Sequence, residues 1–385
     1  MTLMPPEKEM TSGQIKGPQR IVALDFLRGL AIFLVLFRHS IIPPEDAGVL
    51  SPMVTFIKNL GWSGVDLFFV LSGFLVSGLL YREHIKTGHI DVRRFVIRRG
   101  FKIWPLYYFY LVLTSVLTFR RTGYSVSETA SLLWGNYVHI QNYTGTPLPH
   151  TWSLAVEEHF YLLLPLVLVG LLRVRSSVSA IVLICAGVFG ACLAYRVGYF
   201  LAGYEFSYIP IQWATHARID SLSCGVLIGY FYHYKKEMLI NLENRRGGRI
   251  IPWLLMLCLV PLAVLDMKHP LMWTLGYTLN FIGYGGLLHL VLQNDSVLQK
   301  NILVRATAWV GMYSYPIYLF HFGVTRDVIE RLMKLGILQN MPECRWLLFF
   351  LLYAGIAIVI GFLLGRFLET PALRLRDRLF PRVSA

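Results

Sequence analysis

An aspartate, an arginine and a histidine share one face of the first apolar segment, 24-LDFLRGLAIFLVLFRHS-40. Arg28 and His39 are eleven residues apart, which in a helix is three turns plus about 20°, with about 16 Å between them along the axis. Asp25 precedes Arg28 by three residues, so its carboxylate can pair with the guanidinium. Histidine titrates near neutral pH and can take or give a proton. Since ionisable groups inside a membrane span mark functional sites, we predict a site that includes His39, Arg28 and Asp25.

Ionisable residues recur at a similar depth in four other apolar segments. They fall in the outer half of the bilayer if the segments are helices that cross it alternately outward and inward. We expect substrate-binding residues among them, namely Asp66 in 60-LGWSGVDLFFVLSGF-74, Arg218 and Asp220 in 216-HARIDSLSCG-225, and His321 in 313-YSYPIYLFHF-322. We expect catalytic residues in Glu157 and Glu158 of 151-TWSLAVEEHFYLLLP-165.

These residues have structural explanations as well as functional ones. Asp66, Arg218 and Asp220 lie near helix ends, where capping or snorkelling charges are as common as ligand-binding ones. His321 ends its segment beside aromatic residues, where a histidine can simply hydrogen-bond the bundle. The two adjacent glutamates are harder to explain structurally, because they face directions about 100° apart in a helix and each needs a partner.

A basic cluster precedes the third apolar segment. The stretch 93-RRFVIRRGFKIWPLYY-108 contains Arg93, Arg94, Arg98, Arg99 and Lys102. Guanidinium groups bind phosphate oxygens bidentately, so the cluster suits a phosphate-rich ligand. It equally suits anionic lipid or a role in setting membrane topology.

The composition is that of an integral membrane protein. Of 385 residues, 55% are hydrophobic and 15% are charged, and the mean hydropathy is +0.54, whereas about 25% of the residues in a soluble domain are charged. A β-barrel would show short alternating segments instead of long apolar runs. We expect an all-α polytopic fold with ten spans, near 22–42, 60–81, 101–119, 151–172, 178–196, 213–234, 250–266, 271–292, 305–324 and 346–367.

We expect one membrane domain over 21–373, between cytoplasmic tails at 1–20 and 374–385. Lys and Arg in alternate connections number 24 on the side that holds both termini and 9, among them Arg196, on the other. The positive-inside rule therefore predicts that both termini are cytoplasmic. Because the basic residues are concentrated on one side, we attribute the net charge of +14 to membrane topology and not to a nucleic-acid partner. The first segment lacks a small-residue cleavage site, so we expect it to be retained.

The five cysteines predict neither a disulfide framework nor a metal site. They form no C-x-x-C pair, and four of them lie within apolar spans. Cysteine in such a setting acts as a small hydrophobic residue.

Seven motifs, in order from Ile21 to Leu373, resemble the acyltransferase 3 family of integral membrane acyltransferases. They are LDFLRG…HS, GVDLFFVLSGFL, RR..K.WPLYY, TWSLAVEEHFYLLLP, RIDSLSCG, YSYPIYLFHF and LETPAL. The resemblance implies transfer of an acyl group, often acetyl, from cytoplasmic acyl-CoA to a hydroxyl of a surface carbohydrate or glycolipid at the outer side. It also implies about ten transmembrane helices in a bacterial inner membrane and no bound cofactor beyond the donor.

The resemblance assigns roles to particular residues. The family's first-span arginine and its candidate catalytic histidine correspond to Arg28 and His39. Its arginine-rich motif falls on Arg98, Arg99 and Lys102, which we expect to hold the donor's phosphates. Lys102 stands where many members have arginine, so a bidentate contact is lost there and the charge is kept.

These residues fit acyl transfer on chemical grounds. Removing the proton from an attacking hydroxyl needs a base, and His39 can serve. A carboxylate from Glu157 or Glu158 would fix its tautomer, and Arg28 would orient the donor or stabilise the oxyanion. Direct attack by the acceptor and a covalent acyl-histidine both fit.

Two other classes of function compete with an enzyme. Buried acids and histidines also form proton relays in proton-coupled transporters. However, the hydropathy shows no inverted repeat, and the polar groups gather near one side of the membrane. A receptor or scaffold that had lost the chemistry would not be expected to keep His39, Arg28 and both glutamates.

Overall fold

The computed structural model describes residues 21–40, 51–173, 178–334 and 345–381, and all regular structure in these ranges is helical. The prediction of an all-α fold is therefore confirmed for this part of the chain. The 1–20 tail and Cys344 lie outside the described residues.

The α-helices, in chain order, are α1 (Val22–Arg38), α2 (Ser51–Leu60), α3 (Gly64–Thr87), α4 (Val92–Thr122), α5 (Val126–Tyr137), α6 (Gln141–Thr144), α7 (Trp152–Arg173), α8 (Val178–Leu201), α9 (Thr215–Tyr234), α10 (Lys236–Asn244), α11 (Ile251–Met256), α12 (Val260–Val264), α13 (Tyr277–Gln293), α14 (Asp295–Leu298), α15 (Ile302–Met312), α16 (Ser314–Phe320), α17 (Arg326–Lys334), α18 (Arg345–Leu364) and α19 (Thr370–Leu379). Short 3₁₀ segments are η2 (Gly61–Ser63), η3 (Pro149–Thr151), η5 (Gly248–Ile250) and η6 (Leu257–Leu259). Single π-helical turns are η4 (Tyr208–Trp213), η7 (Met272–Gly276), η8 (His321–Thr325) and η9 (Gly365–Glu369).

The predicted count of ten spans is not confirmed. In the described ranges, five helices are long and apolar enough to cross a membrane, or six if the bent pair Lys236–Asn244 and Gly248–Val264 is one span. The predicted 250–266 span is divided into α11, η6 and α12, and the predicted 305–324 span is divided between α15 and α16. Pro252 and Pro261 lie at the first turns of α11 and α12, where proline breaks a continuous helix.

Close helix packing at the centre depends on glycines. A Cβ on Gly73 of α3 would lie 1.9 Å from the carbonyl oxygen of Leu222 in α9, and one on Gly225 of α9 would lie 2.1 Å from that of Val70. Small residues let two membrane helices approach this closely. The α3–α9 pair therefore has a backbone-to-backbone contact that larger side chains would force apart.

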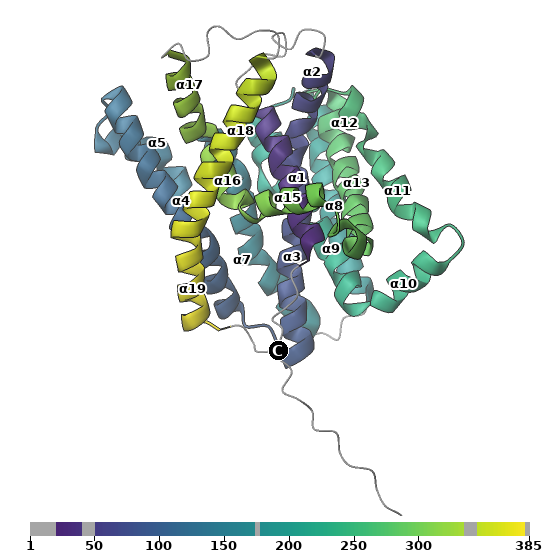
Figure 1. Ribbon diagram of the computed structural model, residues 1–385. Helices are drawn as coiled ribbons and strands as arrows, with labels where there is room; N and C mark the ends of the chain where they lie inside the picture. Colours follow the sequence, from purple (N-terminus) through teal and green to yellow (C-terminus); the bar gives the residue numbers. More distant parts are fainter. Residues whose placement is uncertain (1–20, 41–50, 174–177, 335–344, 382–385) are drawn as a thin grey trace, which may run out of the picture.

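The largest hydrophobic core is built mainly from α1, α3, α4, α7, α9, α16 and α18. Figure 1 shows α1 and α3 at the centre of the bundle, with α15 running across it. It also shows α10 and α19 at one end of the bundle and α2, α12 and α17 at the other. α10 and α19, which the charge count assigns to one side of the membrane, therefore lie at the same end of the molecule.

Candidate active site

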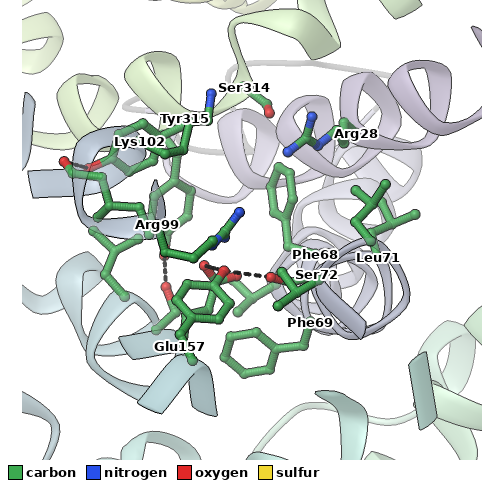
Figure 2. A pocket seen from close by; sticks show the side chains of 18 residues that line it. Arg28, Phe68, Phe69, Leu71, Ser72, Arg99, Lys102, Glu157, Ser314 and Tyr315 are labelled. Carbon is green, nitrogen blue, oxygen red and sulfur yellow. Dashed lines mark hydrogen bonds between the residues drawn. The ribbon is translucent and has the colours of Figure 1, made fainter. Parts of the chain in front are cut away.

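A cavity of about 100 Å³ lies among α1, α3, α4, α7 and α16. Its polar lining includes Arg28, Ser72, Arg99, Lys102, Glu157 and Tyr318. Arg28 and Arg99 extend into this space from opposite sides (Figure 2). Residues from five helices that are far apart in sequence thus share one polar cavity inside an apolar core.

The three cations of the cavity have different partners. Lys102 forms an ion pair with Glu369, the last residue of η9. Arg28 lies 3.8 Å from Asp25, so the predicted i,i+3 pair is confirmed. The guanidinium of Arg99 lies over the ring of Tyr161, with its Cζ 4.2 Å from the ring centre, and its buried Nε has no hydrogen-bond partner. Arg99 therefore has unused hydrogen-bonding capacity with which to bind an anion.

The adjacent glutamates face apart, as the helical geometry predicts. Glu157 lines the cavity and accepts a hydrogen bond of 2.7 Å from the Tyr161 hydroxyl, which also lies 2.6 Å from Ser72 Oγ. Glu158 points to α4, where Trp104 Nε1 donates to it at 3.1 Å. Each glutamate therefore has its own partner.

The expected pairing of a glutamate with His39 is not present. Neither Glu157 nor Glu158 is hydrogen-bonded to His39 in the described part of the chain. Glu157 lies five residues into α7, about 7.5 Å along the axis from its start, at the level of Ser72 and not of His39. The pairing does not form because the two glutamates lie too far along the bundle axis from the end of α1, where His39 lies.

A second histidine takes that place. His39 caps α1, and its Nδ1 lies 3.2 Å from His321 Nε2 and 3.0 Å from the Val35 carbonyl oxygen. His321 is fully buried at the start of η8. The ring of His150, in η3, lies 5.5 Å from that of His321. Three histidines from distant segments therefore gather at the end of α1.

The cavity and the histidines are joined through Tyr318, which lines the cavity. Its hydroxyl lies 2.7 Å from Ser153 Oγ, also in the lining, and donates a 2.7 Å hydrogen bond to the His150 carbonyl. Its own carbonyl oxygen lies 2.5 Å from His321 Nδ1. The same short helix, α16, thus lines the cavity and supports the histidine cluster.

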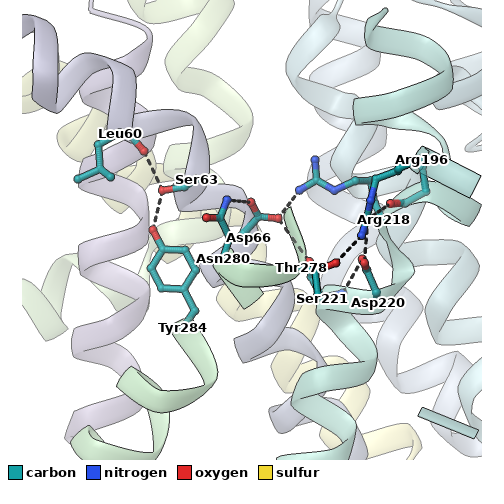
Figure 3. Close-up of polar contacts among 11 residues, drawn as sticks. Leu60, Ser63, Asp66, Arg196, Arg218, Asp220, Ser221, Thr278, Asn280 and Tyr284 are labelled. Atoms are coloured by element: carbon teal, nitrogen blue, oxygen red, sulfur yellow. Dashed lines mark hydrogen bonds and ion pairs between the residues drawn. The ribbon is translucent and has the colours of Figure 1, made fainter. Parts of the chain in front are cut away.

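Asp66, Arg218 and Asp220 do not line the cavity. They belong to a separate buried network, in which Arg218 pairs with Asp66 and Arg196 pairs with Asp220 at 2.8 Å (Figure 3). Asn280 completes it with a bond of 3.4 Å to Asp66. All five residues are buried. The network ties α3, α8, α9 and α13 together and needs no ligand to balance its charges.

Arg196 corrects the charge count made from the sequence. That count places it among the cations of the outer connections, but its side chain is completely buried in α8 and ion-paired. A paired arginine inside a bundle costs far less than an isolated one. Counting charges by position along the chain does not detect such a pair.

Arg98 also lies outside the cavity. It forms a 2.9 Å ion pair with Asp377 of α19 and a hydrogen bond to the Phe380 carbonyl. Of the predicted phosphate-binding trio, Arg99 and Lys102 line the cavity and Arg98 does not.

The sequence analysis missed several residues that the structure places here, namely Ser72, His150, Ser153, Tyr161, Tyr318 and Glu369. His150 directly precedes the TWSLAVEE motif, and Glu369 belongs to the LETPAL motif, so both had a signal in the motif pattern. The tyrosines had none, because aromatic residues are common throughout a membrane bundle. Among the described residues, no cluster of three or more His, Cys, Asp or Glu is arranged to hold a metal ion.

Comparisons with known proteins identify relatives over most of the chain. Residues 21–366 match the family described as "Acyltransferase domain". "O-acetyltransferase OatA" of Staphylococcus aureus is 26% identical over 384 residues, covering 92% of this chain and 57% of the relative. "Putative peptidoglycan O-acetyltransferase YrhL" of Bacillus subtilis is 28% identical over 320 residues, covering 74% and 49%. "Peptidoglycan O-acetyltransferase OatA" of Listeria monocytogenes is 22% identical over 374 residues, covering 91% and 55%.

The chain therefore spans about half the length of the curated relatives that it matches. No solved structure matches it.

Proposed function

Because the chain belongs to the acyltransferase domain family over residues 21–366, we propose that it is a membrane enzyme that moves an acyl group, preferably acetyl, from acyl-CoA to a glycan hydroxyl. The resemblance drawn from the seven motifs is thereby confirmed. All three relatives carry O-acetyltransferase names, and two of these names specify peptidoglycan. A peptidoglycan-like polysaccharide is therefore the acceptor class that we favour.

One observation carries this proposal most strongly. A single cavity has Arg28, Arg99 and Lys102 in its lining and reaches Tyr318, which supports the histidine cluster that includes His39. Arginine and lysine are the usual ligands of phosphate groups. In our proposal the phosphates of the donor bind near Arg99 and Lys102, and its thioester lies toward His39.

The proposed reaction is direct transfer with His39 as base. The acceptor hydroxyl gives its proton to His39 as its oxygen bonds to the acyl carbon. The carbon–sulfur bond then breaks, and the departing thiolate takes the proton from His39 to give free CoA thiol. The alternative, in which His39 first accepts the acyl group, differs in producing a covalent acyl-enzyme.

The proposed orientation is that of the positive-inside rule. The end of the bundle with α10 and α19 (Figure 1) faces the cytoplasm in this proposal. Acyl-CoA would then approach from the α4–α19 side, and the acceptor from the end at which α1 terminates. The protein would be a multi-pass protein of the cell membrane.

Reconstituted protein tests the proposal. Proteoliposomes with acetyl-CoA on the α10/α19 side and an oligosaccharide of N-acetylhexosamines on the other should release CoA thiol and form O-acetyl esters in equal amounts. His39→Gln should lower turnover by about 10² to 10⁴, the scale of a positioned base. His289→Asn, in α13 beside Glu243, is the matched control and should keep full activity. No thiol release from folded protein would favour the transporter instead.

A further inference from the structure

We propose that His321 is a positioning residue for His39. It accepts the hydrogen on Nδ1 of His39 and so keeps the lone pair of His39 Nε2 available for reaction. The inference rests on the proposed function, in which His39 is the base or nucleophile, and it assigns a role that neither the motifs nor the relatives specify.

The Tyr318 carbonyl group fixes the tautomer of His321. Its Nδ1 lies 2.5 Å from the Tyr318 carbonyl oxygen. A carbonyl can only accept, so the hydrogen of the neutral imidazole must be on Nδ1. The other nitrogen, Nε2, then has a lone pair. His321 therefore faces His39 as an acceptor.

Two hydrogen-bond acceptors fix the tautomer of His39. Its Nδ1 faces two acceptors, the Val35 carbonyl oxygen at 3.0 Å and His321 Nε2 at 3.2 Å. The hydrogen must be on Nδ1, because the opposite tautomer would place a lone pair against both acceptors. His39 Nε2 is then unprotonated, as a base or nucleophile must be.

Hydrogen bonds from neighbouring segments hold the backbone around His321. The Tyr353 hydroxyl of α18 donates to its carbonyl oxygen at 3.3 Å. His150 Nε2 donates to the Leu319 carbonyl at 3.1 Å, and the Tyr318 hydroxyl donates back to the His150 carbonyl at 2.7 Å. The turn that carries His321 is therefore fixed from η3 and α18. An acceptor held in this way orients its partner before substrate binds.

The arrangement is a neutral counterpart of an acid–histidine pair. In hydrolases, a buried carboxylate accepts from histidine Nδ1 and selects the reactive tautomer. Here a second imidazole does so within the apolar core. When His39 Nε2 takes the acceptor's proton, Nδ1–H remains bonded to His321, so no further proton has to move.

Nitrogen-15 NMR of the histidine-labelled protein in bilayers tests the inference without reference to activity. His39→Gln identifies the His39 signals by difference. Wild type should show hydrogen on Nδ1 and none on Nε2 of His39. His321→Leu leaves the Val35 carbonyl as the remaining acceptor for His39 Nδ1, so part of the His39 population should shift to hydrogen on Nε2. A wild-type spectrum with hydrogen on Nε2 would overturn the inference by itself.

Kinetics then separate positioning from packing. His321→Leu should lower kcat by about 10², the scale of a misplaced catalytic group, with KM values changed by no more than about twofold. His321→Asn, whose amide oxygen can accept, should recover part of the loss. Equal losses for Leu and Asn in folded protein would contradict the inference. An active His39→Gln would remove the base role, and the NMR result would still decide the tautomer.

Discussion

Arg99 of α4 and Tyr161 of α7 stack inside the cavity, with the guanidinium carbon 4.2 Å from the ring centre. The Tyr161 hydroxyl donates to Glu157, so cation, ring and carboxylate form one continuous contact. A planar guanidinium held against an aromatic face is pre-oriented for a bidentate anion contact. Arg99 is therefore the residue at which we expect the donor to be recognised most strongly.

Arg99→Ala should raise the KM for acetyl-CoA by about 10- to 100-fold, the scale of a hydrogen bond to a charged group. Arg99→Lys should recover only part of the loss, because an ammonium neither stacks on Tyr161 nor binds bidentately. Initial rates at varied donor and fixed acceptor measure the effect. Arg93→Ala, an exposed member of the same basic cluster, is the control. A donor KM unchanged in Arg99→Ala would limit the cluster to topology.

Glu369 forms an ion pair with Lys102, which lines the cavity, so in the proposed function it would compete with the donor's phosphates for Lys102. Glu369→Gln keeps the shape and removes the negative charge. It should lower the donor KM by about threefold, the scale of one partly exposed charge pair, with kcat unchanged. If the donor KM rises instead, Glu369 serves to hold Lys102 in place.

The buried pair Arg196 and Asp220 should be important for stability and not for chemistry, since neither lines the cavity. Arg196→Leu leaves a buried carboxylate without its partner and should cost about 3 to 5 kcal/mol in the free energy of unfolding. The double variant Arg196→Leu/Asp220→Asn should regain most of this. Thermal unfolding in detergent measures both. A fully stable Arg196→Leu protein that cannot transfer acyl groups would instead give the pair a direct role.

Thiol labelling from the two sides of the membrane tests the proposed orientation of the protein. Ser127 of α5 and Lys86 of α3 are exposed near opposite ends of the bundle. In a background with the native cysteines replaced by serine, a thiol at position 127 should react with an impermeant reagent from outside the cell. A thiol at position 86 should react only after the cell is opened. The reverse pattern would invert the proposed donor and acceptor sides.

The sequence could predict the features that depend on local helical geometry. Arg28 and Asp25 pair as their spacing requires, and Glu157 and Glu158 diverge as neighbours on a helix must. Contacts between segments far apart in the chain were not predictable in this way. A carboxylate partner is the natural expectation for His39, because triads commonly contain one, but the fold brings His321 to it.

Ion pairs inside the bundle were the other feature that the sequence could not predict. Arg196 is indistinguishable by sequence from a loop cation, and only the position of Asp220 across the α8–α9 contact shows that it is buried and neutralised. The division of two expected spans has a similar cause. Proline shows where an α-helix can break, but tertiary packing decides whether it does.

The π-helical turn η8 lies between α16, which directly precedes His321, and α17, so the number of residues in this turn sets how α17 is rotated relative to the helix next to the histidine cluster. A π turn is closed by i→i+5 hydrogen bonds and holds one residue more than an α turn. Deleting one residue between 321 and 325 would restore an ordinary α-helix and rotate α17 by about 100° relative to α16. The direction in which α17 leaves the histidine cluster is therefore set by the number of residues in η8, whereas the facing of His321 is set by α16.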